Sequence, residues 1–168
     1  TVQPDVDRIV SSLIEAGAEN LFFLGAGGVM FLTQPAYNLL RTESSFPVFY
    51  EMGAELVASG NCHLGPTSIV VTPSVSGTTK EAVAALTYAK ARGAKVITFT
   101  GSANTPVGAL ADHDFTRLVV DDTSSEMYFL QTLLVALSVM KAKGEIDDYD
   151  VIVDELLRLP KLLIEVKR

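Results

Sequence analysis

Residues 67–79 read Thr-Ser-Ile-Val-Val-Thr-Pro-Ser-Val-Ser-Gly-Thr-Thr, and Lys-Glu-Ala-Val-Ala-Ala-Leu follows at 80–86. The run from Ser68 to Thr72 is almost entirely β-branched and apolar over the length of a strand, which is typical of a buried strand. Apolar residues then recur at helical spacing from Thr79 to Arg92. The sequence therefore predicts a strand, a hydroxyl-rich turn and a helix in succession. We call residues 74–79 the 74–79 turn.

The 74–79 turn has the composition of an anion site. The first backbone N–H groups of a helix have no partner within it, and the aligned peptide dipoles place partial positive charge at the same end. A phosphate group can use both. Gly77 allows close approach of the backbone, and four side chains offer hydroxyl donors: Ser74, Ser76, Thr78 and Thr79. The simpler alternative is that Ser76 or Thr78 only caps the helix, as Ser and Thr often do.

The segments before this unit also alternate between helix and strand. Apolar residues on one face predict a first helix over 6–14, which Gly17 ends. A strand at 21–24 leads into Gly25-Ala26-Gly27-Gly28, and a helix to Arg41 follows, which Pro35 must begin or kink because proline lacks the N–H. We further expect a strand at 46–50 and a short helix at 51–58.

The segments after this unit continue the alternation. We expect a strand at 95–100, a short helix from Pro106 to Ala111, and a strand at 115–120. A long leucine-rich helix is predicted from Ser124 or Ser125 to Lys143, and a last helical stretch at 149–167 that Pro160 interrupts.

This alternation predicts an α/β fold with three layers. Short apolar strands separated by helices indicate a five-stranded parallel sheet with helices on both faces, and we expect the flavodoxin-like order 2-1-3-4-5. Ligands of such sheets bind at the carboxyl ends of the strands. The turns at 25–28 and 74–79 both lie at that edge, after neighbouring strands, so they should face one pocket. We expect one domain over 1–148 and a separate helical segment over 149–168.

Composition limits the classes of function. The 168 residues carry a net charge of -7 and 48% apolar residues, which is typical of a globular domain and argues against a nucleic-acid partner. No stretch has the pattern of a secretory leader or a membrane span, so we expect a cytoplasmic protein and no membrane partner. One cysteine, Cys62, and two histidines are too few for a zinc site. We expect no metal and no cofactor.

Five segments of the sequence resemble the sugar isomerase domain family, whose members bind phosphosugars. The resemblance extends over about residues 20–143 and is carried by 21–28, 74–81, 89–100, 105–112 and 124–127. The Ser-x-Ser-Gly-x-Thr loop of that family is matched by Ser74, Ser76, Gly77 and Thr79, and the resemblance implies that this loop binds the sugar phosphate. It also implies a substrate-binding loop at Gly25, Gly27 and Gly28. Gly28 and Val29 stand where the family usually has Ser or Thr, so this loop offers backbone N–H groups and no hydroxyl.

The resemblance is closest to the first half of double-domain enzymes such as fructoselysine-6-phosphate deglycase and the isomerase part of glucosamine-6-phosphate synthase. In those enzymes the catalytic Glu and His come from the second domain. The resemblance therefore implies that this chain contributes part of an active site and that residues 149–168 suit a connector. The implied partners are a phosphorylated sugar or amino-sugar and either a second such domain or a second copy of the chain.

Isomerisation of a sugar phosphate, or deglycation of a ketosamine phosphate, needs a base beside the carbon that loses its proton. Four residues are candidates: Glu43, Glu55, Glu126 and His63. Glu55 stands where the family has a Glu after its second strand, and Glu43 is nearer to where the catalytic Glu of a second domain would fall. The family has a Glu beside the sugar pocket at Glu126, but residues 123–126 also match a capping box. His63 would act from a partner subunit.

Other functions fit less well. Gly25-Ala26-Gly27 followed by Glu51 imitates a dinucleotide fingerprint, but Met30 occupies the third glycine position. Residues 72–76 do not match the Gly-x-Ser-x-Gly motif of serine hydrolases. The main alternative is a module that senses a phosphosugar without transforming it, as similar domains do in bacterial regulators.

Overall fold

The computed structural model describes residues 3–117 and 124–166. Five parallel strands form one sheet in the order β2-β1-β3-β4-β5, so the predicted fold class and strand order are confirmed. The strands are β1 (Asn20–Gly25), β2 (Val48–Met52), β3 (Ser68–Ser74), β4 (Lys95–Thr100) and β5 (His113–Thr116). The helices are α1 (Gln3–Glu15), α2 (Gly28–Glu43), α3 (Gly53–Ser59), α4 (Lys80–Ala91), α5 (Pro106–Leu110), α6 (Ser124–Ala142) and α7 (Tyr149–Val166).

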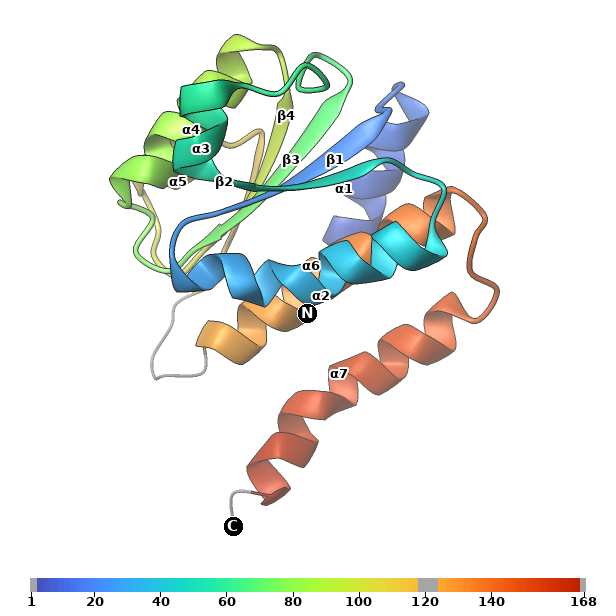
Figure 1. Cartoon of the computed structure of the whole chain (residues 1–168). Coiled ribbons are helices and arrows are strands. Elements are labelled where there is room, and N and C mark those ends of the chain that lie inside the picture. Colours follow the sequence, from blue (N-terminus) through green and yellow to red (C-terminus); the bar gives the residue numbers. More distant parts are fainter. Residues whose placement is uncertain (1–2, 118–123, 167–168) are drawn as a thin grey trace.

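The helices cover both faces of the sheet (Figure 1). One face of β1 and β3 presents Phe23 and Val71 to a core shared with α1, α2 and α6. The other face presents Phe22 and Val70 to a smaller core shared with α3, α4 and α5. Every residue of β3 is buried, as its unbroken apolar run predicts for a central strand with both faces covered. α7 packs beyond these layers, against α6.

Two element boundaries differ from the sequence prediction. β2 spans Val48–Met52 and not 46–50, so Glu51 lies in the strand and α3 begins only at Gly53. The apolar residue that suggested the earlier start, Phe46, is buried in the core before the strand begins. β5 begins at His113, two residues before the predicted start, and the predicted residues 118–120 lie outside the described part of the chain.

Two prolines were expected to disturb helices. α2 does not begin at Pro35, because it already starts at Gly28 and contains the proline in its interior. α7 continues through Pro160, so the predicted interruption is wrong. Pro106 stands at the first position of α5 as predicted, and the Thr105 side chain accepts a hydrogen bond from the N–H of Gly108.

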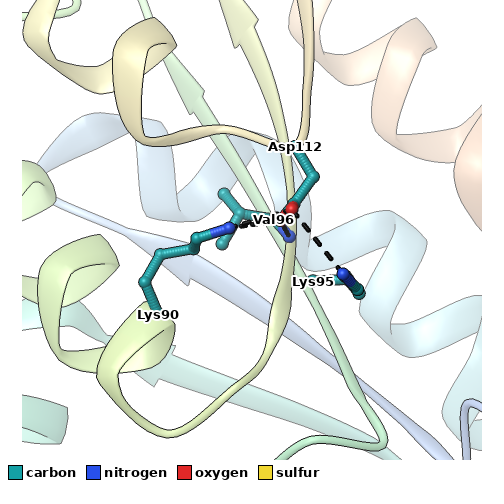
Figure 2. Close-up of polar contacts among 4 residues, drawn as sticks. All are labelled: Lys90, Lys95, Val96 and Asp112. Carbon is teal, nitrogen blue, oxygen red and sulfur yellow. Dashed lines mark hydrogen bonds and ion pairs between the residues drawn. The ribbon is translucent and has the colours of Figure 1, made fainter.

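An ion-pair cluster fixes β5 against β4 at the amino end of the sheet (Figure 2). The Asp112 carboxylate accepts hydrogen bonds from the Lys90 ammonium at 2.8 Å and from the N–H of Val96 at 2.8 Å, and Lys95 lies 3.9 Å away. Burial raises the pKa of Asp112, but these hydrogen bonds and the two positive charges outweigh burial and leave that pKa below 3.8. This cluster lies away from the carboxyl edge of the sheet, so its role is structural.

Candidate functional site

The 74–79 turn leaves the sheet at its carboxyl edge. Ser74 ends β3 beside Thr100 of β4 and is only 4% exposed, while Ser76 and Thr78 are exposed. Thr79 occupies the N-cap position of α4, and its side chain makes no capping hydrogen bond. The simpler alternative, that Ser76 or Thr78 only caps the helix, is wrong, because neither residue occupies the cap position. The first turn of α4 therefore keeps its N–H groups for another acceptor.

In the 74–79 turn, the hydroxyl group of Ser76 remains able to donate a hydrogen bond. The Ser76 Oγ accepts a hydrogen bond from the Thr78 N–H at 3.2 Å and another from the Thr78 Oγ1 at 3.1 Å. Both of these contacts use lone pairs of the Ser76 oxygen, and its own hydrogen is left for an acceptor outside the turn. Beside the positive end of the α4 dipole, that acceptor is favoured when it is an anion.

Contacts with the β4–α5 connection hold the turn in place. The Gly77 carbonyl accepts from the Val107 N–H at 3.0 Å, and the Val75 carbonyl accepts from the Gly101 N–H at 3.1 Å. Gly77 has a φ of 63°, and a Cβ built on it would overlap the Thr105 side chain. The conformation and packing of the turn therefore require glycine at this position, a reason that differs from the ligand approach predicted from the sequence.

The glycine-rich turn after β1 lies at the same edge. A Cβ on Gly25 would come within 2.6 Å of the Met30 Cα, so the end of β1 packs directly on the first turn of α2. Gly27 is the N-cap of α2, with a φ of 58° and no side-chain cap. Space is open around Gly28. The backbone alone forms this turn, and α2, like α4, begins without a side chain that closes its end.

Three adjoining pockets follow the carboxyl edge. The turn pocket, of about 180 Å³, is lined by Ala26, Val29, Pro73, Ser74, Val75, Ser76, Thr79 and Ala82. The middle pocket, of about 400 Å³, is lined by Gly25, Ala26, Gly27, Met52, Ala54, Thr79 and Glu81. The outer pocket, of about 410 Å³, is lined by Gly27, Met30, Phe31, Gln34, Tyr50, Met52 and Glu55. Each pocket shares two lining residues with the next, so the three form one groove.

The predicted site residues are brought together only in part. Ser74, Ser76 and Thr79 line the turn pocket, whereas Gly77 and Thr78 support it from outside. Gly25 and Gly27 line the middle pocket, while Gly28 lines none of the three.

The acid–base candidates lie in four different places. Glu55 is exposed in the first turn of α3 and lines the outer pocket. Glu126, in the first turn of α6, opens onto a separate cavity of about 380 Å³ that is also lined by Leu32 and Leu159. Thr123, the start of its predicted capping box, lies outside the described residues. Of the four candidates, only Glu55 lines the groove.

Glu43 and His63 lie at the other end of the sheet. Glu43 is the last residue of α2, which starts beside the groove and runs away from it for 16 residues. His63 lies in the loop that leads into β3, where its ring stacks on Phe49 at 5.0 Å and its carbonyl accepts from the Asn20 amide at 3.1 Å. Within this chain neither residue reaches the 74–79 turn.

The sequence motifs do not identify every groove residue, and Tyr50, Met52 and Glu81 are among those they miss. Met52 was missed because β2 ends two residues later than predicted, at the groove, whereas Tyr50 already stood at the predicted strand end but belongs to no motif. The Tyr50 hydroxyl donates to the Met30 carbonyl, and burial raises the pKa of Tyr50, an effect that a hydrogen bond with Thr33 partly offsets. Glu81 lies inside the segment 74–81 and lines the middle pocket. Its place in that segment, two positions after Thr79, could have identified it as a site residue.

Within residues 3–117 and 124–166, no three His, Cys, Asp or Glu side chains gather as a metal site would require. In that same part of the chain, no helix has the length and apolarity needed to cross a bilayer.

Comparisons with known proteins agree with this fold. The family model of the SIS domain matches residues 14–142, and the chain belongs to the SIS domain family. This is the sugar isomerase family that the sequence motifs resemble. No curated protein sequence matches the chain.

Solved structures share the fold. A candidate phosphosugar isomerase from Salmonella typhimurium LT2 is 26% identical, with a TM-score of 0.83, over 95% of this chain and 49% of that chain. One from Bacillus subtilis is 20% identical, with a TM-score of 0.80, over 98% of this chain and 52% of that chain. The C-terminal domain of glucosamine-fructose-6-phosphate aminotransferase from Francisella tularensis is 18% identical, with a TM-score of 0.78, over 97% of this chain and 52% of that chain. This chain thus spans about half the length of each of these structures.

Proposed function

We propose that the chain binds a phosphorylated sugar, with the phosphate against the 74–79 turn. The observation that carries this proposal is the uncapped start of α4, which faces the turn pocket beside Ser76 and Thr79. Unpartnered N–H groups, the helix dipole and free hydroxyl hydrogens all favour a doubly charged oxyanion at this point. Hydrogen bonds to a charged acceptor contribute about 1.5–3 kcal/mol each, so a few of them suffice for binding. Membership of the SIS domain family supports the same ligand class.

The reaction we favour is proton transfer on the bound sugar, either aldose–ketose isomerisation or deglycation of a ketosamine 6-phosphate. With the phosphate in the turn pocket, the sugar carbons extend into the middle pocket, beside Glu81 and toward Glu55. Glu43, Glu126 and His63 do not line this groove, so within this chain they are poorly placed for the reaction. A partner of the same family would supply the missing acid or base, as the resemblance to double-domain enzymes implies.

The assembly we propose follows from the same resemblance. Residues 1–148 form the phosphosugar-binding domain, and 149–168 connect it to a second SIS domain or dock against a second copy in a homodimer. Exposed apolar side chains on α7, which include Val151 at 60% and Leu162 at 50%, support a covering partner. We also propose that the protein acts in the cytoplasm, where phosphorylated sugars are formed and used.

A sensing module without catalysis is the second candidate function. The observation that favours it is the lining of the turn pocket, in which no side chain of the described residues is ionisable. Such a pocket can bind a phosphate ester but offers no group that could remove a proton from its ligand.

Two measurements on the full chain with fructose 6-phosphate test these functions together. Binding should raise the melting temperature, because a ligand that binds only the native state stabilises it by mass action. Proton transfer should introduce deuterium at C1 of the sugar in D₂O, which NMR detects. A raised melting temperature without deuterium would show that this chain alone binds the sugar without proton transfer, as both the sensing function and an active site completed by a partner predict. An unchanged melting temperature at millimolar ligand would overturn phosphosugar binding itself.

A further inference from the structure

Two rows of polar side chains cross the sheet near its carboxyl end. The parallel register sets them side by side on β3, β4 and β5: first Thr72, Thr98 and Asp114, then Ser74, Thr100 and Thr116. Alternate residues of a strand face the same side, so both rows continue the face that Val70 and Val96 present to the core under α4 and α5. The second row begins in the turn pocket, at Ser74, and ends on the edge strand β5.

Asp114 is the acceptor on which the hydroxyl groups of these rows converge. Its carboxylate accepts hydrogen bonds from the Thr98 and Thr116 hydroxyls, both at 2.7 Å, and from the Thr100 hydroxyl at 3.0 Å. Thr98 and Thr100 are 0% exposed, so solvent cannot replace this acceptor. In the described part of the chain, the Thr98 hydroxyl has no other hydrogen-bond partner. The carboxylate therefore fixes the orientation of both buried threonines.

Asp114 also contacts the start of α5. A Cβ built on Gly108 would lie 2.8 Å from the Asp114 Oδ2 and 3.2 Å from the Thr105 Oγ1, so the backbone of Gly108 lies directly against the carboxylate. The Gly108 N–H donates to the Thr105 Oγ1, and the Thr105 side chain fills the space beside Gly77. Contacts thus run without a break from Asp114 through α5 to the 74–79 turn.

No positive charge accounts for the position of Asp114. Within residues 3–117 and 124–166, no Lys or Arg forms a salt bridge with it, whereas Asp112 pairs with Lys90. Asp114 lines none of the three groove pockets, so it does not contact a ligand bound there. Its negative charge even opposes an anion in the turn pocket. The contacts of Asp114 therefore serve to fix the residues around it.

We propose that Asp114 is a positioning residue for phosphate binding. This inference rests on the proposed function of the turn pocket. The carboxylate orients Thr100 beside Ser74, which lines that pocket. It also supports Gly108, which in turn fixes Thr105 against the turn. The turn is thereby held in its binding conformation before a ligand arrives, and a preformed site avoids the cost of ordering on binding.

Calorimetric titration of the full chain with fructose 6-phosphate tests the inference. Asp114→Asn keeps the shape of the side chain but replaces one acceptor oxygen by a donor, so the three hydroxyls can no longer all be satisfied. We expect this variant to bind at least fivefold more weakly than the wild type. The direction of the change is decisive, because the loss of a nearby negative charge would by itself strengthen the binding of an anion.

Asp112→Asn is the matched control. It removes the same charge two positions earlier, where the carboxylate bonds Lys90 and Val96 and not the residues around the turn. We expect it to change the affinity less than twofold, although it also removes a stabilising contact. The NMR amide resonance of Gly77 in the ligand-free protein gives a readout that needs no ligand. This resonance should shift in Asp114→Asn and stay in place in Asp112→Asn.

Thr98→Val tests the same contact from the donor side, should Asp114→Asn not fold. It preserves the shape of a buried side chain but removes a hydroxyl that orients the carboxylate, so it should also weaken binding. Unchanged affinity in the variant that folds, equal weakening by Asp114→Asn and Asp112→Asn, or an unshifted Gly77 resonance would overturn the inference and leave the phosphate site in place. Failure of the wild type to bind fructose 6-phosphate and inorganic phosphate would instead overturn the proposed function.

Discussion

Gly77 and Thr105 lie in direct contact, with no room between them for a single methyl group. The Cα of Gly77 faces the Thr105 side chain, and the Thr105 Oγ1 in turn accepts a hydrogen bond from Gly108 in the first turn of α5. The conformation of the proposed phosphate-binding turn thus depends on a residue 28 positions later in the sequence. Because the Val107 N–H also donates to Gly77, the β4–α5 connection and the 74–79 turn are one structural unit.

Gly77→Ala should therefore weaken both folding and phosphate binding. Its φ of 63° is unfavourable for alanine, and the added methyl group overlaps Thr105, so we expect a loss of about 1–3 kcal/mol in the free energy of unfolding. Urea unfolding measures the loss. Gly28→Ala is the matched control, since Gly28 has open space at its Cβ and should cost nothing. Equal stability of the two variants would contradict the packing argument.

Ser76→Ala combined with Thr79→Ala should abolish the rise in melting temperature that fructose 6-phosphate produces. Both side chains line the turn pocket, and each lost hydrogen bond to a charged acceptor costs about 1.5–3 kcal/mol of binding. Among the described residues, neither side chain hydrogen-bonds outside the 74–79 turn, so the melting temperature without ligand should stay close to that of the wild type.

Thr87→Ala is the control for this pair. Thr87 lies exposed in the same helix, where its hydroxyl donates to the Val83 carbonyl at 2.8 Å, and it should leave ligand binding unchanged. A retained ligand response in the Ser76 and Thr79 double variant would place the phosphate elsewhere.

Asp112→Asn should make stability less dependent on acid pH. The folded-state pKa of Asp112 lies below the unfolded value of 3.8, so this carboxylate stabilises the fold above pH 3.8. That contribution is lost as the pH falls through the folded-state pKa. Since Lys90 is 36% exposed and Asp112 22%, we expect a loss of only about 1 kcal/mol at neutral pH, and this loss should shrink as the pH falls below 3.8.

Urea titrations at several pH values measure this difference. The control is Asp5→Asn, because Asp5 pairs with Arg8 at the exposed surface, 3.2 Å away. This variant should differ from wild type by less than about 0.5 kcal/mol at any pH. An Asp112→Asn difference that stayed constant across the acid range would show that its carboxylate charge is not what stabilises β5.

Val151→Asp combined with Leu162→Asp should shift the chain toward the monomer in sedimentation experiments. Both apolar side chains are at least half exposed on α7, and charged residues there would disfavour a covering partner. Because exposed positions contribute little to the fold, the melting temperature should hold. Lys161→Asp changes the charge of the same helix without removing an apolar contact and should not alter assembly. A wild-type chain that is monomeric at high concentration would rule out the homodimer.

The sequence predicts the layered fold well because its signals are local. The central strands β1, β3 and β4 are short, largely apolar runs, and strands that alternate with helices restrict the sheet to a few orders. The prediction is less accurate where an apolar residue serves the core without joining the sheet. Phe46 is such a residue, and it drew the expected start of β2 two positions too early.

The candidate site is only partly predictable for a related reason. Ser74, Ser76 and Thr79 follow one another in the chain, so a local motif identifies them. Tyr50 and Met52 reach the same groove from another strand, and only the parallel register, which sets Met52 beside Gly25, brings them there. The contact between Gly77 and Thr105 is likewise invisible to any local pattern.

The open start of α4 gives the protein a built-in reporter of occupancy. Amides at the beginning of this helix have no intrahelical acceptor, so in the empty protein they should exchange with deuterium from the solvent far faster than those of the helix interior. A bound phosphate ester would slow amide exchange in the first turn of α4 and leave exchange in the strands of the sheet unaffected. Mass spectrometry of the peptide that spans the junction would then reveal which metabolites bind, without any assay of turnover.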